Sequence, residues 1–454
     1  MAVSATWVPM RWPEGWSDPS LLDLLKGTPV NCLVFLWGDR KPAAALVEEG
    51  RRRGLALVGL IEGAGDRAAA IRDAQAAHLD AIALDTPAQA ALPVIAWGEK
   101  SKLNWHSPAA GFAIADGVWP SIPSKDSAEG GPTGAPWVDS NGWMVQMGRS
   151  LALGKTVWVN AVPPKEGTIR PEHYELAVAD AGAYGGRWVV TLDEKLSAAL
   201  AARNPKALET WKGIARTTAF FEAHRDWADF PPCANIAVVS DFSGPNEYVG
   251  QELLNLLPRR GVPYRVIDRP RAAAAPLDGL AGILYPDQQA PDAALRQRLS
   301  EFVAEGGVLL ANAGWPAPQG VVPSKDVFGR WKIYASGKGR LAIAAEAGLD
   351  PYLMAGDAQL IVGRRHDLVR YFNFGSLNGY YTASPRTAVL HVLNYAANSG
   401  SDMVSVVLMR SCRGARLWRP GVEVPEPVEM QRLPQGIELH LPPVGAYAAV
   451  ELEG

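Results

Sequence analysis

Three carboxylates stand directly after short apolar runs in the first half of the chain. Glu62 ends LVGLIE, Asp85 ends AIALD and Asp116 ends FAIAD, and each is followed by Gly or by a Thr-Pro pair. In glycosidic bond cleavage one carboxylic acid protonates the leaving oxygen, while a second carboxylate attacks the sugar or activates water. We therefore predict Asp85, Asp116 and Glu62 as catalytic residues.

Polar side chains also follow most of the other apolar runs. Carboxylates at such positions serve equally as helix N-caps, and this is our interpretation of Asp66 and Asp193, and of Asp139 ahead of a helix carrying Trp143. The predicted polar substrate contacts are Arg11, Asp39, Glu99, Asp139, Asn160 and Glu194.

Tryptophan is the most frequent aromatic residue, with 16 Trp against 12 Tyr and 10 Phe. The C–H faces of sugar rings stack on aromatic planes while their hydroxyls need polar partners, so indoles mixed with acids are typical of a saccharide site. Any single indole is more commonly a core residue, and it is their clustering in the first half of the chain that favours binding. The predicted aromatic contacts are Trp7, Trp37, Trp97, Trp119 and Trp137.

The stretch from Gly111 to Trp143 joins a strand-like run, the acid Asp116, a long Gly/Pro/Ser-rich segment and a helix-like segment. Long segments without secondary structure are uncommon inside domains and are usually functional or disordered. We predict an active-site loop of a barrel enzyme, with an ordinary surface loop as the alternative.

Eight short apolar runs alternate with helix-like segments over residues 1–230. This alternation predicts parallel strands, and eight of them close a (β/α)8 TIM-like barrel. The region is shorter than the usual barrel of about 250 residues, so some helices must be short or absent. An open doubly wound sheet is the structural rival. The runs are Ala5–Pro9, Asn31–Trp37, Ala56–Ile61, Ala81–Leu84, Pro93–Trp97, Phe112–Ala115, Thr156–Asn160 and Trp188–Leu192.

Two further regions differ from the first. Residues 231–335 repeat the strand-helix alternation, which predicts a flavodoxin-like or amidotransferase-like α/β domain, and no cysteine follows its strands. Residues 336–454 hold a connecting segment rich in Arg and Tyr and then alternate polar and apolar residues, which predicts a small antiparallel β sandwich. Arg365, His366 and Tyr380 in the connecting segment are reserve candidates for the active site, although a structural connection is the simpler interpretation.

Composition excludes several classes of function. A net charge of −3 without charge blocks gives no footprint for nucleic acid or an anionic membrane. No apolar run reaches the roughly 18 residues of a membrane span. The three cysteines lack zinc or disulfide spacing, and neither a metal nor a cofactor is expected. No signal peptide is evident, which indicates a cytoplasmic protein or one whose leader has been removed.

The second and third regions resemble a known family. The segments AVVSDFSGPNEYVGQELLNLLPRRGVPYRVID and ILYPDQQAPDAALRQRLSEFVAEGGVLLANAG, with TAVLHVLNY and GIELHLPPVGAYAAVELEG near the end, resemble β-galactosidases that carry a trimerisation domain and related bacterial glycoside-hydrolase-like proteins. The resemblance implies a barrel, an amidotransferase-like domain without its nucleophile and a small β domain. It also implies a homo-oligomer, trimer or dimer, with interfaces in residues 234–330.

The catalytic pair of that family does not match this chain. Those enzymes place a Glu after strand four and a Glu after strand seven, where this chain has Asp85 and Asn160. The positions of Asp85 and Asp116 instead resemble α-galactosidase and α-glucosidase barrels, which implies Asp85 as nucleophile and Asp116 as acid/base, with Glu62 able to replace either.

Two functions therefore stand as hypotheses. The first is a glycoside hydrolase that uses a two-carboxylate mechanism, in which retention of configuration is expected. The second is a catalytically degenerate barrel that binds saccharides or acts as a scaffold. A carbohydrate is the expected partner in both.

Overall fold

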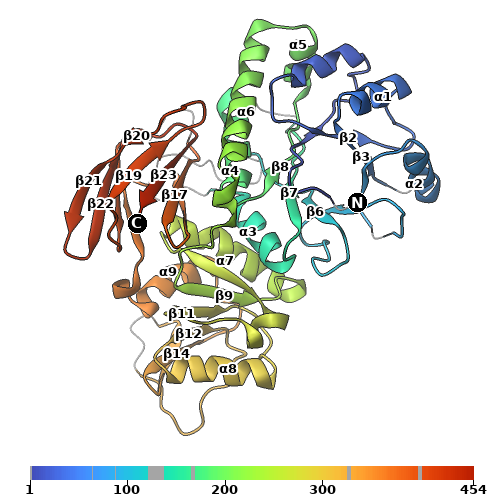
Figure 1. Ribbon diagram of the computed structural model, residues 1–454. Coiled ribbons are helices and arrows are strands. Elements are labelled where there is room, and N and C mark those ends of the chain that lie inside the picture. Colours follow the sequence, from blue (N-terminus) through green and yellow to red (C-terminus); the bar gives the residue numbers. More distant parts are fainter. Residues whose placement is uncertain are drawn as a thin grey trace.

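The computed structural model describes residues 3–63, 65–86, 88–120, 138–164, 169–324, 329–396 and 401–454. Figure 1 shows three parts along the chain: a blue-to-green barrel, a yellow-to-orange α/β domain and a red β sandwich that packs beside the green helices. This order of a TIM barrel followed by α/β and β domains confirms the predicted fold class.

Eight parallel strands form the first sheet in sequence order. The ring closes where the Arg11 amide donates to the Val190 carbonyl (2.9 Å) and the Val190 amide donates to the Pro9 carbonyl (2.9 Å). The strands are β1 (Pro9–Arg11), β2 (Cys32–Leu36), β3 (Ala56–Ile61), β4 (Ala81–Leu84), β5 (Val94–Gly98), β6 (Gly111–Ile114), β7 (Thr156–Val159) and β8 (Arg187–Trp188).

Two indoles fill the barrel interior. Trp97 and Trp158 are 2% and 1% exposed and belong to the same buried cluster as Ala81, Ala83 and Ala113. Small residues on neighbouring strands leave the volume that the large rings occupy, as close packing requires. The alternate residues of each strand point outward and pack against the surrounding helices.

Helices surround only part of the barrel. The short connections from β4 to β5 and from β5 to β6 contain no helix in their described residues, in agreement with the short sequence. The helical segments of this part are η1 (Pro19–Leu25), α1 (Ala44–Arg52), α2 (Arg67–Ala76), α3 (Gly142–Leu151), α4 (Pro171–Gly182), α5 (Glu194–Ala201), α6 (Pro205–Ala223) and η2 (Arg225–Asp229).

Two local predictions for the barrel were wrong. The first strand begins at Pro9 and not at Ala5, because a turn closed by the Trp7 amide and the Ser4 carbonyl (3.1 Å) precedes it. The N-cap of α3 is Asn141 and not Asp139, since the chain enters the helix two residues later than expected. Asp66 and Asp193 are N-caps of α2 and α5, as predicted.

The second domain is a six-stranded sheet of order β10-β9-β11-β12-β14-β13. The expected boundary at residue 335 falls inside the β13–β14 hairpin, which extends this sheet to Ala344. Its elements are β9 (Ile236–Ser240), η3 (Gly244–Asn246), α7 (Glu247–Arg259), β10 (Tyr264–Asp268), η4 (Arg269–Ala274), β11 (Gly282–Tyr285), α8 (Ala293–Ala304), β12 (Val308–Ala311), β13 (Trp331–Ser336), β14 (Gly339–Ala344), α9 (Pro351–Val362) and η5 (Arg364–His366).

The C-terminal part consists of two antiparallel sheets, of order β15-β18-β22-β21 and β16-β17-β23-β19-β20. Alternating buried and partly exposed residues, as in β22, let each sheet cover the other, which confirms the predicted sandwich. The strands are β15 (Val369–Phe372), β16 (Leu377–Ala383), β17 (Thr387–Asn394), β18 (Val404–Leu408), β19 (Gly414–Trp418), β20 (Glu426–Pro427), β21 (Glu429–Leu433), β22 (Gly436–Leu441) and β23 (Tyr447–Glu453).

The barrel and the second domain are joined by buried polar contacts. The Gln146 side chain of α3 donates to the Tyr264 carbonyl at the start of β10 (2.8 Å), and the Ser140 hydroxyl donates to the Asn255 side chain of α7 (3.1 Å). Among the helices whose residues are described, none is both long and apolar enough to cross a membrane.

Candidate active site

The carboxyl ends of the barrel strands carry the candidate site. Leu60 of β3 and Ala83 of β4 belong to the barrel interior, so two residues further on Glu62 and Asp85 continue the inward-facing rows. Arg11 at the end of β1 lies 3.9 Å from Glu62 and therefore belongs to the same rim.

Glu62 and Asp85 are neighbours across two adjacent strands. Ile61 pairs with Leu84 in the parallel ladder, so the two carboxylates occupy the next position on each strand. The Gly63 amide, beside Glu62, donates to Asp85 Oδ2 (3.2 Å). Neighbouring strands lie about 4.8 Å apart, so the backbones that carry the two acids are adjacent.

Arg67 positions Asp85. The Arg67 guanidinium donates to Asp85 Oδ1 (2.7 Å) and to the Gly63 carbonyl (3.3 Å), which joins the loop after β3 to the end of β4. Sequence reasoning missed this residue, although a signal was present. An arginine in the first turn of a helix opposes the helix dipole, so its place directly after the N-cap Asp66 indicates a partner outside the helix.

A cavity of ≈ 400 Å³ opens beside Glu62, between the ends of β2 and β3 and the start of α2, whereas Asp85 lines a separate cavity of ≈ 640 Å³ beside β4 and β5. The cavity beside Glu62, which we call the rim cavity, brings together three of the predicted residues, Trp37, Asp39 and Glu62. Trp37 is 7% exposed, and within the described ranges its indole N–H has no hydrogen-bond partner. A buried donor without an acceptor is costly, so this indole N–H does not contribute a hydrogen bond to stability within the described residues.

Asp116 points away from this pair. The Lys100 amide and side chain both donate to it, at 2.8 and 2.7 Å. Glu99 is likewise engaged, by Lys102 at 2.8 Å, and its side chain is half exposed. Both acids lie on the rim, and like Asp85 they do not line the rim cavity.

The remaining polar candidates are dispersed. Asn160 is buried at the end of β7, where its Oδ1 accepts from the Thr191 hydroxyl (3.1 Å). Glu194 is exposed in the first turn of α5, and Asp139 is exposed before α3.

Two predicted indoles occupy core positions and not a ligand surface. Trp97 fills the barrel interior and leaves no face for a sugar. Trp7 precedes β1, and because strands of a barrel run parallel it lies at the amino end, opposite the mouth, where it packs against the interior cluster. Trp137 lies outside the described residues.

Trp119 is also a core residue, contrary to its predicted role as a wall of the site. It is 7% exposed, and its ring meets Tyr174 and Trp188 edge to face at centroid distances of 5.0 and 5.2 Å. Its indole N–H donates to the Val162 carbonyl (3.1 Å).

Trp119→Phe should lower the free energy of unfolding by about 1–2 kcal/mol, because a hydrogen bond and part of the ring volume are lost. KM should stay unchanged. Trp37→Phe is the matched control: it loses the same ring volume but no hydrogen bond within the described residues, so stability should fall less, and KM should rise because Trp37 lines the rim cavity. Urea unfolding and steady-state kinetics separate the two outcomes, and a raised KM for Trp119→Phe would return this residue to the site.

The reserve candidates do not reach the rim cavity. Tyr380 stacks on Tyr184 at a centroid distance of 4.0 Å, near the amino ends of β7 and β8. Arg365 and His366 belong to η5, and the His366 carbonyl accepts from the Asn235 side chain at the start of β9.

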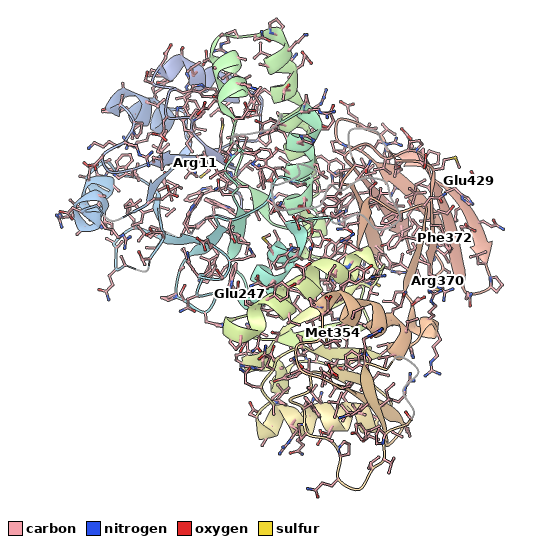
Figure 2. The ribbon with its side chains drawn as sticks, turned by 180° about the vertical axis from the view of Figure 1, so that it is seen from behind. Arg11, Glu247, Met354, Arg370, Phe372 and Glu429 are labelled. Carbon is pink, nitrogen blue, oxygen red and sulfur yellow. The ribbon has the colours of Figure 1, made fainter. Side chains whose placement is uncertain are left out.

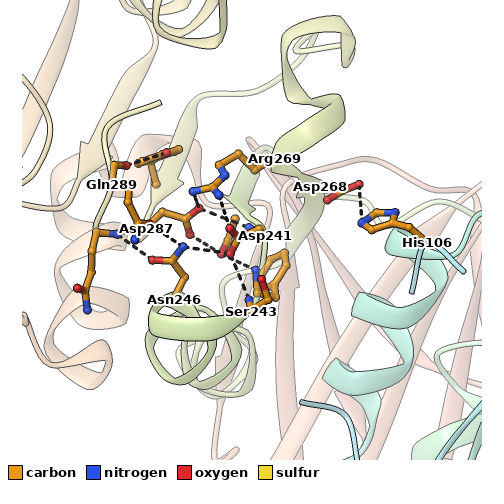
Figure 3. Close-up of polar contacts among 12 residues, drawn as sticks. His106, Asp241, Ser243, Asn246, Asp268, Arg269, Asp287 and Gln289 are labelled. Atoms are coloured by element: carbon orange, nitrogen blue, oxygen red, sulfur yellow. Dashed lines mark hydrogen bonds and ion pairs between the residues drawn. The ribbon is translucent and has the colours of Figure 1, made fainter. Parts of the chain in front are cut away.

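A second polar cluster lies at the carboxyl ends of β9 and β11, the topological switch point of the second domain (Figure 3). The Ser240 hydroxyl donates to Asp287 Oδ1 (2.5 Å), and Arg269 pairs with Asp287 (2.7 Å) and with Asp241. Asn246 donates to Asp241 (3.0 Å). Burial raises the pKa of Asp287 to about 6, while the Ser240 hydrogen bond lowers it. Each carboxylate of the cluster accepts from neighbouring donors, which joins the carboxyl ends of β9 and β11 to η4.

Across the described ranges, no group of three or more His, Cys, Asp or Glu side chains is arranged to hold a metal ion.

Comparison with known proteins gives structural matches only. No protein-family model and no curated protein matches the sequence. Alpha-L-fucosidase isoenzyme 2 from Paenibacillus thiaminolyticus matches with a TM-score of 0.61 and 12% identity over 99% of each chain.

Two β-galactosidases match as well. The cold-adapted enzyme from Rahnella sp. R3 has a TM-score of 0.63 and 11% identity over 100% of this chain and 99% of that one. The enzyme from the Antarctic haloarchaeon Halorubrum lacusprofundi has a TM-score of 0.54 and 14% identity over 99% of this chain and 98% of that one. The protein therefore shares the overall fold of these three glycosidases.

Proposed function

We propose that the protein is a glycoside hydrolase whose catalytic pair is Glu62 and Asp85. One observation supports this most strongly: two carboxylates stand side by side at the carboxyl ends of β3 and β4, where barrel enzymes place their catalytic groups, and Glu62 lines a cavity of suitable size. The glycosidase names of the structural neighbours agree with it.

The two acids take different roles because their surroundings differ. Arg67 and the Gly63 amide hold the Asp85 carboxylate at 2.7 and 3.2 Å, which orients it as the nucleophile. Glu62 has Arg11 at 3.9 Å and no closer ion-pair partner among the described residues, and we assign it the acid/base role. Asp85 attacks the anomeric carbon as Glu62 protonates the leaving oxygen. Glu62 then takes a proton from water, which cleaves the glycosyl-Asp85 bond.

The strand spacing supports retention of configuration as part of this proposal. Retaining enzymes hold their carboxyl groups about 5–5.5 Å apart, whereas inverting enzymes need about 6.5–9.5 Å to admit water. Adjacent in-register strands favour the shorter separation.

A panel of p-nitrophenyl glycosides tests the proposal, with α-L-fucoside and β-D-galactoside included on the basis of the neighbours' names. We expect turnover of at least one glycoside, and proton NMR of the first-formed sugar should show the retained anomer. If no glycoside of the panel is hydrolysed but calorimetry detects saccharide binding, the result would support a binding or scaffolding protein instead.

A further inference from the structure

A second cavity, of ≈ 510 Å³, lies away from the barrel between the end of α7, helix α9, η5 and β15. Four arginines line it, and we call it the arginine cavity: Arg259, Arg260, Arg364 and Arg370. Figure 2 shows Arg370 with Phe372 on the part of the sandwich near α9, the helix that carries Met354. The lining therefore combines the second domain with the sandwich.

The charges in the arginine cavity are not balanced by its own acids. Asp367 is the one carboxylate among its described lining residues, and it already accepts from Arg370 (2.8 Å) and from Gln359 (3.3 Å). Arg364 is exposed and has no ion pair within the described parts of the chain. Arg260 lies over the Tyr352 ring, 4.4 Å from its centroid, and has no carboxylate partner there either.

Helix polarity explains only part of this cluster. Cations at a helix C-terminus are stabilised by the dipole, which accounts for Arg259 and Arg260 at the end of α7. Arg370 of β15 is placed by its bonds to Asp367 (2.8 Å) and to the Arg364 carbonyl (3.0 Å), whereas the Arg364 side chain of η5 has no ion pair among the described residues. Burial lowers the pKa of Arg259, and the neighbouring charge of Arg260 lowers it further, as expected where like charges meet.

We propose that the arginine cavity is a non-catalytic site for the oxyanion group of a small acidic saccharide, the carboxylate of a uronate or the phosphate of a sugar phosphate. Guanidinium groups match both oxyanions through paired N–H donors. Tyr352 and Phe372 are 38% and 51% exposed beside the arginines and offer ring faces to the apolar side of a sugar. The site is independent of the catalytic pair proposed above.

Calorimetric titration of the full chain with glucuronate, glucose 6-phosphate, inorganic phosphate and glucose tests the proposal. We expect at least one of the two acidic sugars to bind and glucose not to bind. Inorganic phosphate should compete with the acidic sugar, and the affinity for the acidic sugar should fall as the NaCl concentration is raised. Which acidic sugar binds more tightly identifies the oxyanion. Equal binding of glucose, or no binding of either acidic sugar, would overturn the proposal.

Arg364→Gln should weaken binding of the acidic sugar at least tenfold, the loss expected for one charge-assisted hydrogen bond. Arg364→Lys should recover only part of it, because lysine keeps the charge without the paired donors. Arg296→Gln, which removes an exposed arginine from α8, is the matched control and should bind like the wild type. Unchanged affinity in Arg364→Gln would remove the site from this cavity. Turnover of the aryl glycoside should not change in any of these variants.

Discussion

Glu62→Gln and Asp85→Asn should each abolish most of the proposed glycosidase activity, whereas Asp116→Asn should retain it. Positioned proton transfer contributes about 10²–10⁴-fold to rate, which sets the loss expected for Glu62→Gln on a substrate with a poor leaving group. With 2,4-dinitrophenol as the leaving group, Glu62→Gln should lose much less activity, because that leaving group departs without a proton. Asp85→Asn should lose activity on both substrates.

Azide separates the two roles. In Asp85→Ala, azide should restore turnover and give a glycosyl azide whose anomeric configuration is inverted relative to the substrate. In Glu62→Ala, azide should give a glycosyl azide whose configuration is retained. Asp116→Asn is the matched control, since it also removes one ion-paired carboxylate from the same rim, the one held by Lys100 at 2.7 Å. A hundredfold loss in that variant, with activity kept in Glu62→Gln, would move the acid/base role to Asp116.

Strand-length runs and the acids that follow them could be predicted from sequence because both are local features. An apolar run followed at once by Asp or Glu places the acid at a strand end wherever the strand lies, as Glu62 and Asp85 show. The direction in which the Asp116 side chain points could not be predicted, because it depends on the contact with Lys100 in the preceding loop.

The roles of the indoles could not be predicted from composition. Trp37 and Trp119 are equally buried, at 7% exposed, but the described protein supplies an acceptor only for the Trp119 N–H. That distinction depends on the Val162 carbonyl, 43 residues away in sequence from Trp119. Long-range contacts of this kind leave no periodic signal.

Asp180→Ala should destabilise the protein by about 3 kcal/mol or more. Asp180 of α4 is fully buried, and its Oδ1 accepts from the Tyr395 hydroxyl (2.6 Å) and the Gly142 amide (3.2 Å). Its Oδ2 accepts from the Asn141 amide (2.6 Å) and side chain (3.0 Å). Each buried donor left without an acceptor costs about 1–3 kcal/mol, and the variant leaves several at once.

The same carboxylate joins three parts of the molecule: the start of α3, helix α4 and the end of the sandwich strand β17. Urea unfolding should therefore show loss of the barrel and the sandwich together. Asp278→Ala, which removes an exposed aspartate, is the matched control and should stay within about 0.5 kcal/mol of the wild type. An Asp180→Ala variant as stable as this control would show that water replaces the carboxylate.

The pH dependence of Asp180 has a definite sign. Burial raises its pKa to about 6 from an ordinary value of 3.8, and the hydrogen bonds from Tyr395 and Asn141 oppose the rise. Between about pH 4 and pH 6 the folded chain thus holds a proton that the unfolded chain releases. The stabilising contribution of this proton is present below pH 4 and is lost as pH rises through about 6.

Asp180→Asn cannot titrate at this position, so it isolates the contribution of Asp180 from that of Asp287, whose pKa is also raised to about 6 by burial. The stability of the wild type relative to Asp180→Asn should fall by about 3 kcal/mol from pH 4 to pH 7, the free energy of a shift of about two pKa units. Urea midpoints at half-unit pH intervals measure this difference. A difference that stays constant over the whole range would mean that Asp180 remains ionised in the folded protein, stabilised by the N-terminus of α3 and its four donors.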